Sequence, residues 1–258
     1  MTLIDFIILV SAGVAVGFIN TLAGGGSTIS LSILMLLGLS PTMANGTNRI
    51  GIAIQNIVGV SSFKQQGVLE TKKGFLLAIP ATIGSILGSF IAVDLNESIF
   101  EKAMGVILLI MLGFTLFNPD KLIKEQTALV NKKLNWKQYV LFFFIGIYGG
   151  FIHIGIGYFL LASLIIGAGY ELVKANAVKV LIVLVYTPFS LAVFIWNDMI
   201  DYKMGFTLAI GTALGAFIAS RLAVKRGAGF VRWVIVVIIL LTAAHLFELV
   251  DFKAILQK

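Results

Sequence analysis

Two positively charged residues, Arg49 and Lys179, stand in otherwise apolar stretches of the sequence. Uncharged, largely apolar residues follow them at positions 50–54 and 180–185. A charge at membrane depth costs several kcal/mol unless it is paired, so such residues are usually functional. No carboxylate in the neighbouring segments is an obvious partner. The two cations could attract a small anion; the alternative is that both side chains extend to the lipid–water interface.

A glycine-rich break precedes each cation. Gly24, Gly25 and Gly26 interrupt an apolar run over residues 6–39 and are followed by Ser27 and Thr28. Non-helical backbone at membrane depth is tolerated only where protein buries it or a water-filled cavity meets it. We therefore expect a helical hairpin whose tip offers free N–H groups and hydroxyls to an anion. The alternative is a tight turn between two ordinary spans.

A matching tip, with Gly155 and Gly157, is expected at residues 153–158. His153 in this tip is either a proton carrier or a side chain with a packing role. Several amide side chains also lie in apolar surroundings, and their concentration near the tips favours a polar cavity over separate interhelical hydrogen bonds. The expected substrate-binding residues are Asn20, Gly24, Gly25, Gly26, Ser27, Thr28, Asn45, Thr47, Asn48, Arg49, His153, Gly155, Gly157, Asn176 and Lys179, with Gln55 and Asn56 as further polar groups.

The sequence lacks the residues that catalysis, metal binding or nucleotide binding would need. An intramembrane enzyme needs a paired acid and base, or a nucleophile with its base, and the apolar segments contain neither arrangement. The chain has no cysteine, and its two histidines and its carboxylates do not have the spacing of a metal site. No nucleotide-binding motif is present. We expect no catalytic residues, no metal and no cofactor.

Composition identifies the class of protein that must position these residues. Hydrophobic residues make up 59% of the chain and charged residues 12%, against about 45–50% and about 25% in soluble domains. The mean hydropathy is +1.03. The sequence therefore predicts an all-α polytopic membrane protein with about eight to ten helical segments. The net charge of +7 is typical of loops facing anionic lipid rather than of nucleic-acid binding. The first helix lacks a basic leading region and is expected to be retained rather than cleaved.

Apolar segments of the first half are expected to be helical at residues 6–22, 28–38, 48–63, 74–93 and 103–117. The second is too short to cross a bilayer comfortably. Residues 45–49 are expected to lead into the third, and Pro80 to kink the fourth. Residues 118–137 form the longest polar stretch and are expected to link two halves.

The second half repeats the first. Gly17, Gly26 and Gly38 recur at Gly146, Gly155 and Gly167, a constant shift of 129, and Arg49 corresponds to Lys179. A nine-residue segment at 84–92 recurs at 211–219 with six identities, and both copies have small residues at spacings suited to close helix packing in lipid. We expect two repeats of about five helical segments each, both opening with a glycine-broken hairpin: residues 1–117 and residues 138–258, joined by the linker 118–137.

Positive charges indicate how the repeats face. If each half crosses the bilayer an odd number of times, the repeats are inverted and one side collects 14 of the 19 Lys and Arg residues, against 5 on the other. Parallel repeats would split them 11 to 8. The inverted arrangement satisfies the positive-inside rule better. It places the linker and the loops at 64–73 and 221–229 in the cytoplasm, and both termini outside.

These segments resemble the sulfite exporter TauE/SafE family over essentially the whole chain. The resemblance rests on Gly17-Phe18-Ile19-Asn20 with Ala23-Gly24-Gly25-Gly26, on Ala44-Asn45-Gly46-Thr47-Asn48-Arg49, and on Gly149-Gly150-Phe151, Gly155-Ile156-Gly157 and Lys179. It implies movement of small anions, often sulfite, sulfoacetate or other organosulfur compounds, across the bacterial cytoplasmic membrane. This sequence has Asn20 where many members have Asp, and His153 and Tyr158 where small residues are common. The particular substrate and any proton coupling through position 20 therefore do not follow from the resemblance.

The sequence as a whole predicts a secondary transporter of a small anion, and the resemblance implies an exporter of sulfite or an organosulfonate. The alternatives are a carrier for another small organic acid or for a metal–anion complex and, more remotely, an intramembrane enzyme. The expected partners are the small anion and the lipid bilayer, without nucleic acid. A coupling proton or other ion, the direction of transport and the oligomeric state are left open.

Overall fold

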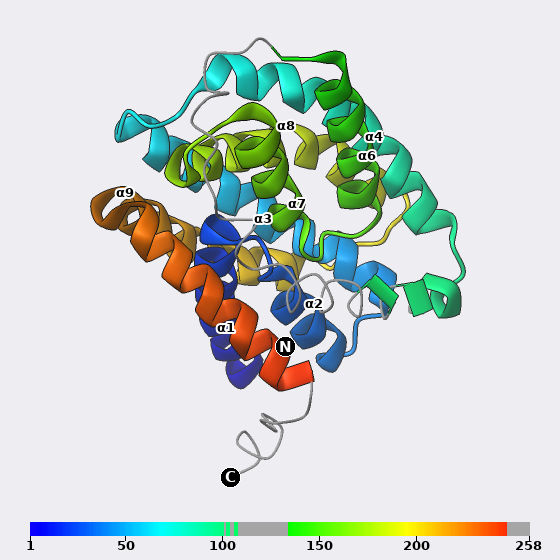
Figure 1. Cartoon of the computed structure of the whole chain (residues 1–258). Coiled ribbons are helices and arrows are strands. Elements are labelled where there is room, and N and C mark those ends of the chain that lie inside the picture. The colour runs from blue at the N-terminus through cyan, green and yellow to red at the C-terminus, as the bar shows by residue number, and fades with distance from the viewer. Residues whose placement is uncertain (101, 104–105, 108–133, 247–258) are drawn as a thin grey trace.

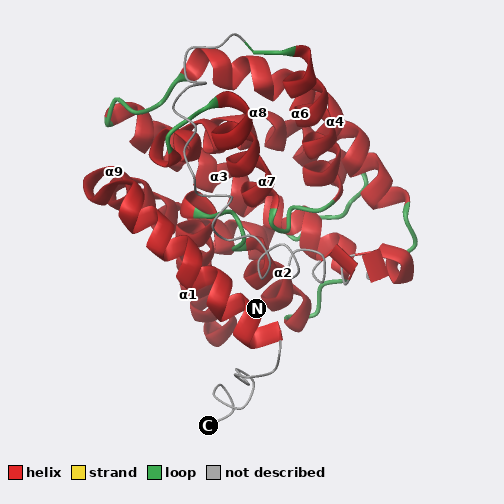
Figure 2. Cartoon of the chain, viewed as in Figure 1, coloured by secondary structure: helices red, strands yellow, loops and turns green. Residues whose placement is uncertain are grey.

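The computed structural model describes residues 1–100, 102–103, 106–107 and 134–246. Within these residues every regular element is a helix, as Figure 2 shows. Most of the expected helix at 103–117, most of the linker 118–137 and the last residues of the chain lie outside the described residues. The all-α prediction is confirmed for the part described.

The first two helices form the expected interrupted pair. α1 (Leu3–Leu22) starts at a capping box, in which Thr2 and Asp5 bond each other's backbone N–H groups, and ends at the glycines. α2 (Ser27–Leu36) has 10 residues, about 15 Å of helix, while a bilayer core is about 30 Å thick. It is therefore too short to cross a membrane, as expected.

α3 (Pro41–Gln65) begins earlier than the sequence pattern indicated. Ser40 accepts a hydrogen bond from the N–H of Met43, and Pro41 occupies the first turn, which together form a strong helix start. The expectation that residues 45–49 lead into a helix starting at residue 48 is therefore wrong. Asn45 and Arg49 lie one and two turns inside α3. α4 (Thr71–Asp94) follows after a short loop and contains Pro80.

The second half also opens with a broken helix. α6 (Trp136–Phe151) ends at residues 152–155, and α7 (Ile156–Ala162) continues into the short π-helical segment η2 (Ser163–Gly167). α8 (Leu172–Trp196) and α9 (Tyr202–Leu246) complete the fold. Residues 221–229, expected to form a loop, are mostly helical instead. They belong to α9, whose helical geometry is interrupted at Gly227 (φ 72°).

Helices from the two halves pack against each other in pairs, α1 on α9 and α4 on α6 (Figure 1). Glycines of both helices line each contact: Gly13 and Gly17 with Gly211 and Gly215 between α1 and α9, and Gly84 and Gly88 with Gly146 and Gly150 between α4 and α6. A Cβ atom at most of these positions would collide with the facing backbone, so glycine permits the close approach. Because Gly17 corresponds to Gly146 and Gly84 to Gly211 in the sequence repeat, the two contacts join matching helices. The relative orientation of the halves stays a prediction.

In the described part of the chain, four helical stretches are long and apolar enough to cross a membrane: Leu3–Leu22, Thr71–Asp94, Leu172–Trp196 and Tyr202–Ile235. Large apolar side chains such as Ile79, Phe144 and Phe189 are exposed on the outside of the bundle, as expected for a surface that contacts lipid. Trp136, Trp196 and Trp233 are exposed as well. The first begins α6 and the second ends α8, which suits the membrane–water interface. The described chain is that of a polytopic membrane protein.

Candidate functional site

The two glycine tips touch each other inside the molecule. Gly24 has φ +102°, and a Cβ at this residue would lie against the backbone of Gly157; a Cβ at Gly157 would likewise meet the backbone of Gly24. Gly155, which precedes α7, also has a positive φ of 68°. These glycines are required both by backbone conformation and by the close approach of two chain segments. The hairpin tips of the two halves therefore meet backbone to backbone.

A small cavity lies beside this contact. The space not filled by atoms is about 240 Å³, a figure that includes space open to solvent. The residues that line it come from α1, α3, α8 and both tips: Asn20, Gly24, Gln55, Asn56, His153, Ile156, Gly157, Lys179 and Val183. Among these lining residues Lys179 is the cation, and none is a carboxylate.

Lys179 is held by the carboxyl end of α1. It is 2% exposed, and its Nζ donates to the carbonyl oxygens of Asn20 and Thr21, both at 2.9 Å, and to Oδ1 of Asn176 at 2.7 Å. The last carbonyls of a helix lack intrahelical partners and carry a partial negative charge. A cation from the second half thus caps a broken helix of the first half.

Arg49 has the same arrangement with the halves exchanged. Its side chain is fully buried, and its two terminal nitrogens donate to the carbonyl oxygens of Gly149 at 3.1 Å and Gly150 at 2.6 Å, at the end of α6. The guanidinium carbon also lies 4.6 Å from the centre of the Phe194 ring. Neither cation reaches the surface of the protein, so the alternative that both extend to the lipid–water interface is wrong.

The carbonyl groups that the two cations cap belong to equivalent positions of the sequence repeat. Asn20 and Thr21 are followed 129 positions later by Gly149 and Gly150, and Arg49 is followed 130 positions later by Lys179. Equivalent cations therefore cap equivalent helix ends, each in the opposite half. Neither contact involves a carboxylate.

His153 lines the cavity and has a polar partner. It is 5% exposed, and its Nδ1 lies 3.2 Å from the hydroxyl of Tyr186 on α8. This contact fixes the ring beside the cavity. The second tip therefore contributes an imidazole to the site, as well as the bare backbone of Gly157.

The amide side chains divide into two groups. At the cavity, Nδ2 of Asn20 donates to Ser27 Oγ and to Gln55 Oε1, both at 3.4 Å, and its Oδ1 has no hydrogen-bond partner in the described structure. Farther along α3, Nδ2 of Asn45 donates to the carbonyl of Phe151 at 2.9 Å, and Asn48 is fully buried. Asn45 therefore lies near the end of α6, and neither residue lines the cavity.

Five of the expected residues line the cavity, namely Asn20, Gly24, His153, Gly157 and Lys179. Gly25, Gly26, Ser27, Thr28 and Gly155 belong to the tips beside it, and Asn176 positions Lys179. Arg49 and Asn45 contact the end of α6 instead, and Asn48 is buried on α3 outside the cavity lining. Thr47 points elsewhere: its hydroxyl accepts a hydrogen bond from the N–H of Asp201, in the connection between α8 and α9.

Four lining residues were not among the expected binding residues. Gln55 and Asn56 had a usable signal, because they are polar residues in an apolar helix. Val183 and Ile156 had none, since an apolar residue on an apolar helix cannot be assigned to a cavity from sequence.

Comparison with known proteins agrees with this architecture. The model of the family described as "Sulfite exporter TauE/SafE" matches residues 9–246. The chain is 26% identical over 241 residues to a "Probable membrane transporter protein" of Haemophilus influenzae, covering 93% of each chain. It is 25% identical over 232 residues to the "Probable membrane transporter protein YfcA" of Escherichia coli K12, covering 89% of this chain and 85% of that protein.

A third relative, "Probable membrane transporter protein ORF9" of a Sinorhizobium species, is 24% identical over 230 residues, covering 89% of this chain and 87% of that protein. No solved structure matches the chain significantly. The matched residues include both glycine tips, both buried cations and every residue that lines the cavity. The chain therefore belongs to the sulfite exporter TauE/SafE family of membrane transporters.

Proposed function

We propose that the protein is a secondary transporter that exports a small anion, such as sulfite or an organosulfonate, across the bacterial cytoplasmic membrane. The observation that carries this proposal is the cavity between the glycine tips, with the buried cation Lys179 and no carboxylate in its lining. Asn20, Gln55, Asn56 and His153 supply further hydrogen-bonding groups there. Such a site attracts negative charge.

The same features argue for alternating access. Secondary transporters often bind substrate near the bilayer midplane, between discontinuous helices of two inverted repeats. In this chain both broken helices reach the cavity. Each half also supplies a cation that caps the end of a broken helix in the other half. We propose that the two halves face opposite ways, with the linker in the cytoplasm and both termini outside.

A carrier for another small organic acid is the second candidate, since the lining would also accept a carboxylate ligand. An intramembrane enzyme is disfavoured because the lining places no carboxylate beside His153 as an acid–base partner. The metal–anion complex raised by the sequence would need metal ligands. Among the described residues no group of three or more His, Cys, Asp or Glu side chains could hold a metal ion.

Transport is tested with purified protein in sealed vesicles loaded with unlabelled sulfite and diluted into labelled sulfite. We expect exchange of labelled sulfite, recovered chemically unchanged, with competition by sulfoacetate and weaker competition by acetate. Lys179→Gln should reduce exchange at least tenfold. Lys174→Gln, at an exposed lysine five residues earlier on the same helix, α8, is the matched control and should exchange normally.

Two results would overturn the proposal: no exchange of any small anion by the wild-type protein, or chemical conversion of the substrate. Strong competition by acetate with none by sulfoacetate would favour the organic-acid carrier. Size-exclusion profiles and thermal melting of each variant separate loss of transport from loss of fold.

A further inference from the structure

Two consecutive residues of α3 carry buried polar atoms that no described group satisfies. Asn48 and Arg49 are both 0% exposed. Neither Nδ2 nor Oδ1 of Asn48 has a hydrogen-bond partner, and Nε of Arg49 has none. An unsatisfied buried polar group costs about 1–3 kcal/mol. An apolar side chain at position 48 would avoid this cost, so the amide at this position needs a partner from outside the described chain, either water or a ligand.

These residues continue the polar face of the cavity along α3. Gln55 and Asn56, which line the cavity, lie seven residues after Asn48 and Arg49. Seven residues are close to two helical turns. Asn48 therefore lies on the same face of α3 as Gln55, and Arg49 on the same face as Asn56, at a separation of about 10 Å along the helix. Farther from the cavity, Asn45 Oδ1 and Thr42 Oγ1 are also buried without a partner. Polar groups in need of hydrogen bonds therefore extend from the cavity toward the start of α3.

The surroundings of Arg49 repeat those of Lys179. Lys179 caps the end of α1, and Asn56 of α3 lines the same cavity. Arg49 caps the end of α6, and Tyr186 of α8 stands 130 positions after Asn56 in the sequence. The Tyr186 hydroxyl lies 3.1 Å from where a Cβ of Gly149 would be, next to the carbonyl that Arg49 binds. The same combination thus occurs twice: a cation from one half lies beside a helix end and a polar side chain of the other half.

We propose that Arg49, Asn48 and Tyr186 form a second anion site, one step along the transport path from the cavity at Lys179. The proposal rests on the function proposed above, because its occupant is the same transported anion. Nε of Arg49, Nδ2 of Asn48 and the Tyr186 hydroxyl are donors suited to the oxygens of a small oxyanion. An anion passing between two equivalent sites keeps a positive charge beside it over about 10 Å of its route.

Asn48→Leu provides the sharpest test, because a structural role and a binding role predict different results. Leucine removes the unsatisfied amide, so the variant without anion should melt at a higher temperature than the wild type. Its transport of sulfite in sealed vesicles should fall at least tenfold. Thr212→Val is the control: its hydroxyl already donates to the carbonyl of Gly51 at 3.0 Å. This variant should melt at a lower temperature and transport sulfite normally.

Calorimetry with sulfite measures the sites directly and does not depend on the folding of one variant. The wild type should bind two anions per chain, and Asn48→Leu, Arg49→Gln and Lys179→Gln should each bind one. A stoichiometry of one in the wild type, or normal transport by Asn48→Leu, would overturn the second site while leaving the cavity at Lys179 in place. No binding and no exchange of any tested anion by the wild type would overturn the proposed function itself.

Discussion

Arg49 and Lys179 keep their charges inside the protein because each side chain ends among the free carbonyls of a helix terminus. The sequence was sufficient to single out both residues, since a cation in an apolar stretch is visible without a structure. It could not supply their partners. Those are backbone atoms of Gly149, Gly150, Asn20 and Thr21, at least 100 positions away along the chain, and every residue type has the same carbonyl.

Arg49→Lys and Arg49→Gln should differ in stability and in transport. Lysine keeps the charge and can donate to the carbonyls of Gly149 and Gly150, as Lys179 does at the other helix end. Glutamine keeps fewer donors and no charge, and hydrogen bonds to charged groups contribute about 1.5–3 kcal/mol each. Thermal melting should rank the proteins wild type, Arg49→Lys, Arg49→Gln, and vesicle transport should follow that order. Equal melting temperatures for wild type and Arg49→Gln would show that the cap contributes nothing.

At the scale of elements, composition and glycine placement were enough to predict the broken helices, including the short α2. The start of α3 was missed because the polar residues 45–49 resemble a loop, whereas Ser40 and Pro41 set the boundary. At residues 221–229 a loop was expected, whereas the structure has a helix interrupted only at Gly227. The sequence does not show which backbone φ angle a glycine among helix-forming residues will adopt.

The contact between the glycine tips should be sensitive to a single methyl group. Gly24→Ala and Gly157→Ala each place a Cβ against the backbone of the other tip, so we expect transport in vesicles to fall more than tenfold. Gly38→Ala is the control, because Gly38 also has a positive φ, +98°, but nothing lies within 4 Å of its added Cβ. It should lower the melting temperature modestly and leave the transport rate near that of the wild type.

Gly25→Ala should be milder than the two tip variants, since its Cβ meets only the side chain of Tyr158, which can rotate away. If Gly24→Ala and Gly157→Ala transported as well as Gly38→Ala, the approach of the tips would have no part in transport.

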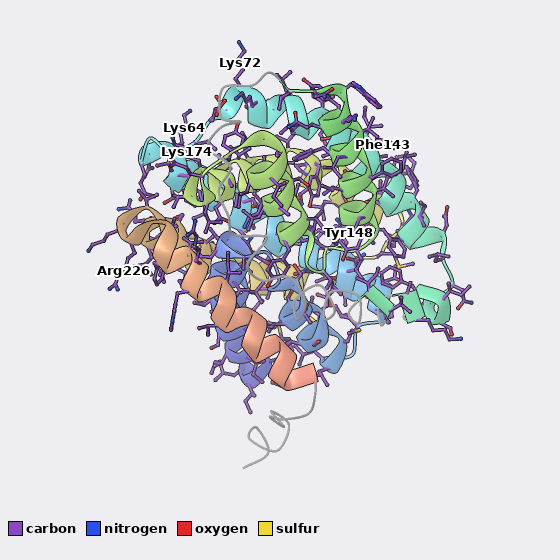
Figure 3. All side chains as sticks on the ribbon, viewed as in Figure 1. Lys64, Lys72, Phe143, Tyr148, Lys174 and Arg226 are labelled. Atoms are coloured by element: carbon purple, nitrogen blue, oxygen red, sulfur yellow. The ribbon has the colours of Figure 1, made fainter. Side chains whose placement is uncertain are left out.

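At the scale of the whole molecule, the repeat in the sequence was a guide to which helices correspond but not to which helices touch. α1 packs on α9 and α4 on α6, so each half is covered by the other. Pairing of this kind depends on the path of the chain in space. The expected inverted orientation rests on the distribution of lysine and arginine, and Figure 3 shows Lys64, Lys72 and Lys174 toward the same end of the molecule.

Labelling of single cysteines tests that orientation, because the native chain contains no cysteine. Lys72 and Lys203 are both exposed and are predicted to lie on opposite sides of the membrane. An impermeant thiol reagent should label Lys203→Cys on intact cells, and Lys72→Cys only after the cells are permeabilised. Labelling of Lys72→Cys from outside, with protection of Lys203→Cys, would reverse the predicted topology.

The three tryptophans have an optical consequence. Trp136, Trp196 and Trp233 are the only tryptophans of the chain, all are exposed on its outer surface, and none lines the cavity. Native fluorescence should therefore respond to brominated lipids, whose bromine atoms quench nearby indoles, and stay constant when an anion binds. Quenching by bromines placed at different depths along the acyl chain would then measure how deeply this protein sits in the bilayer.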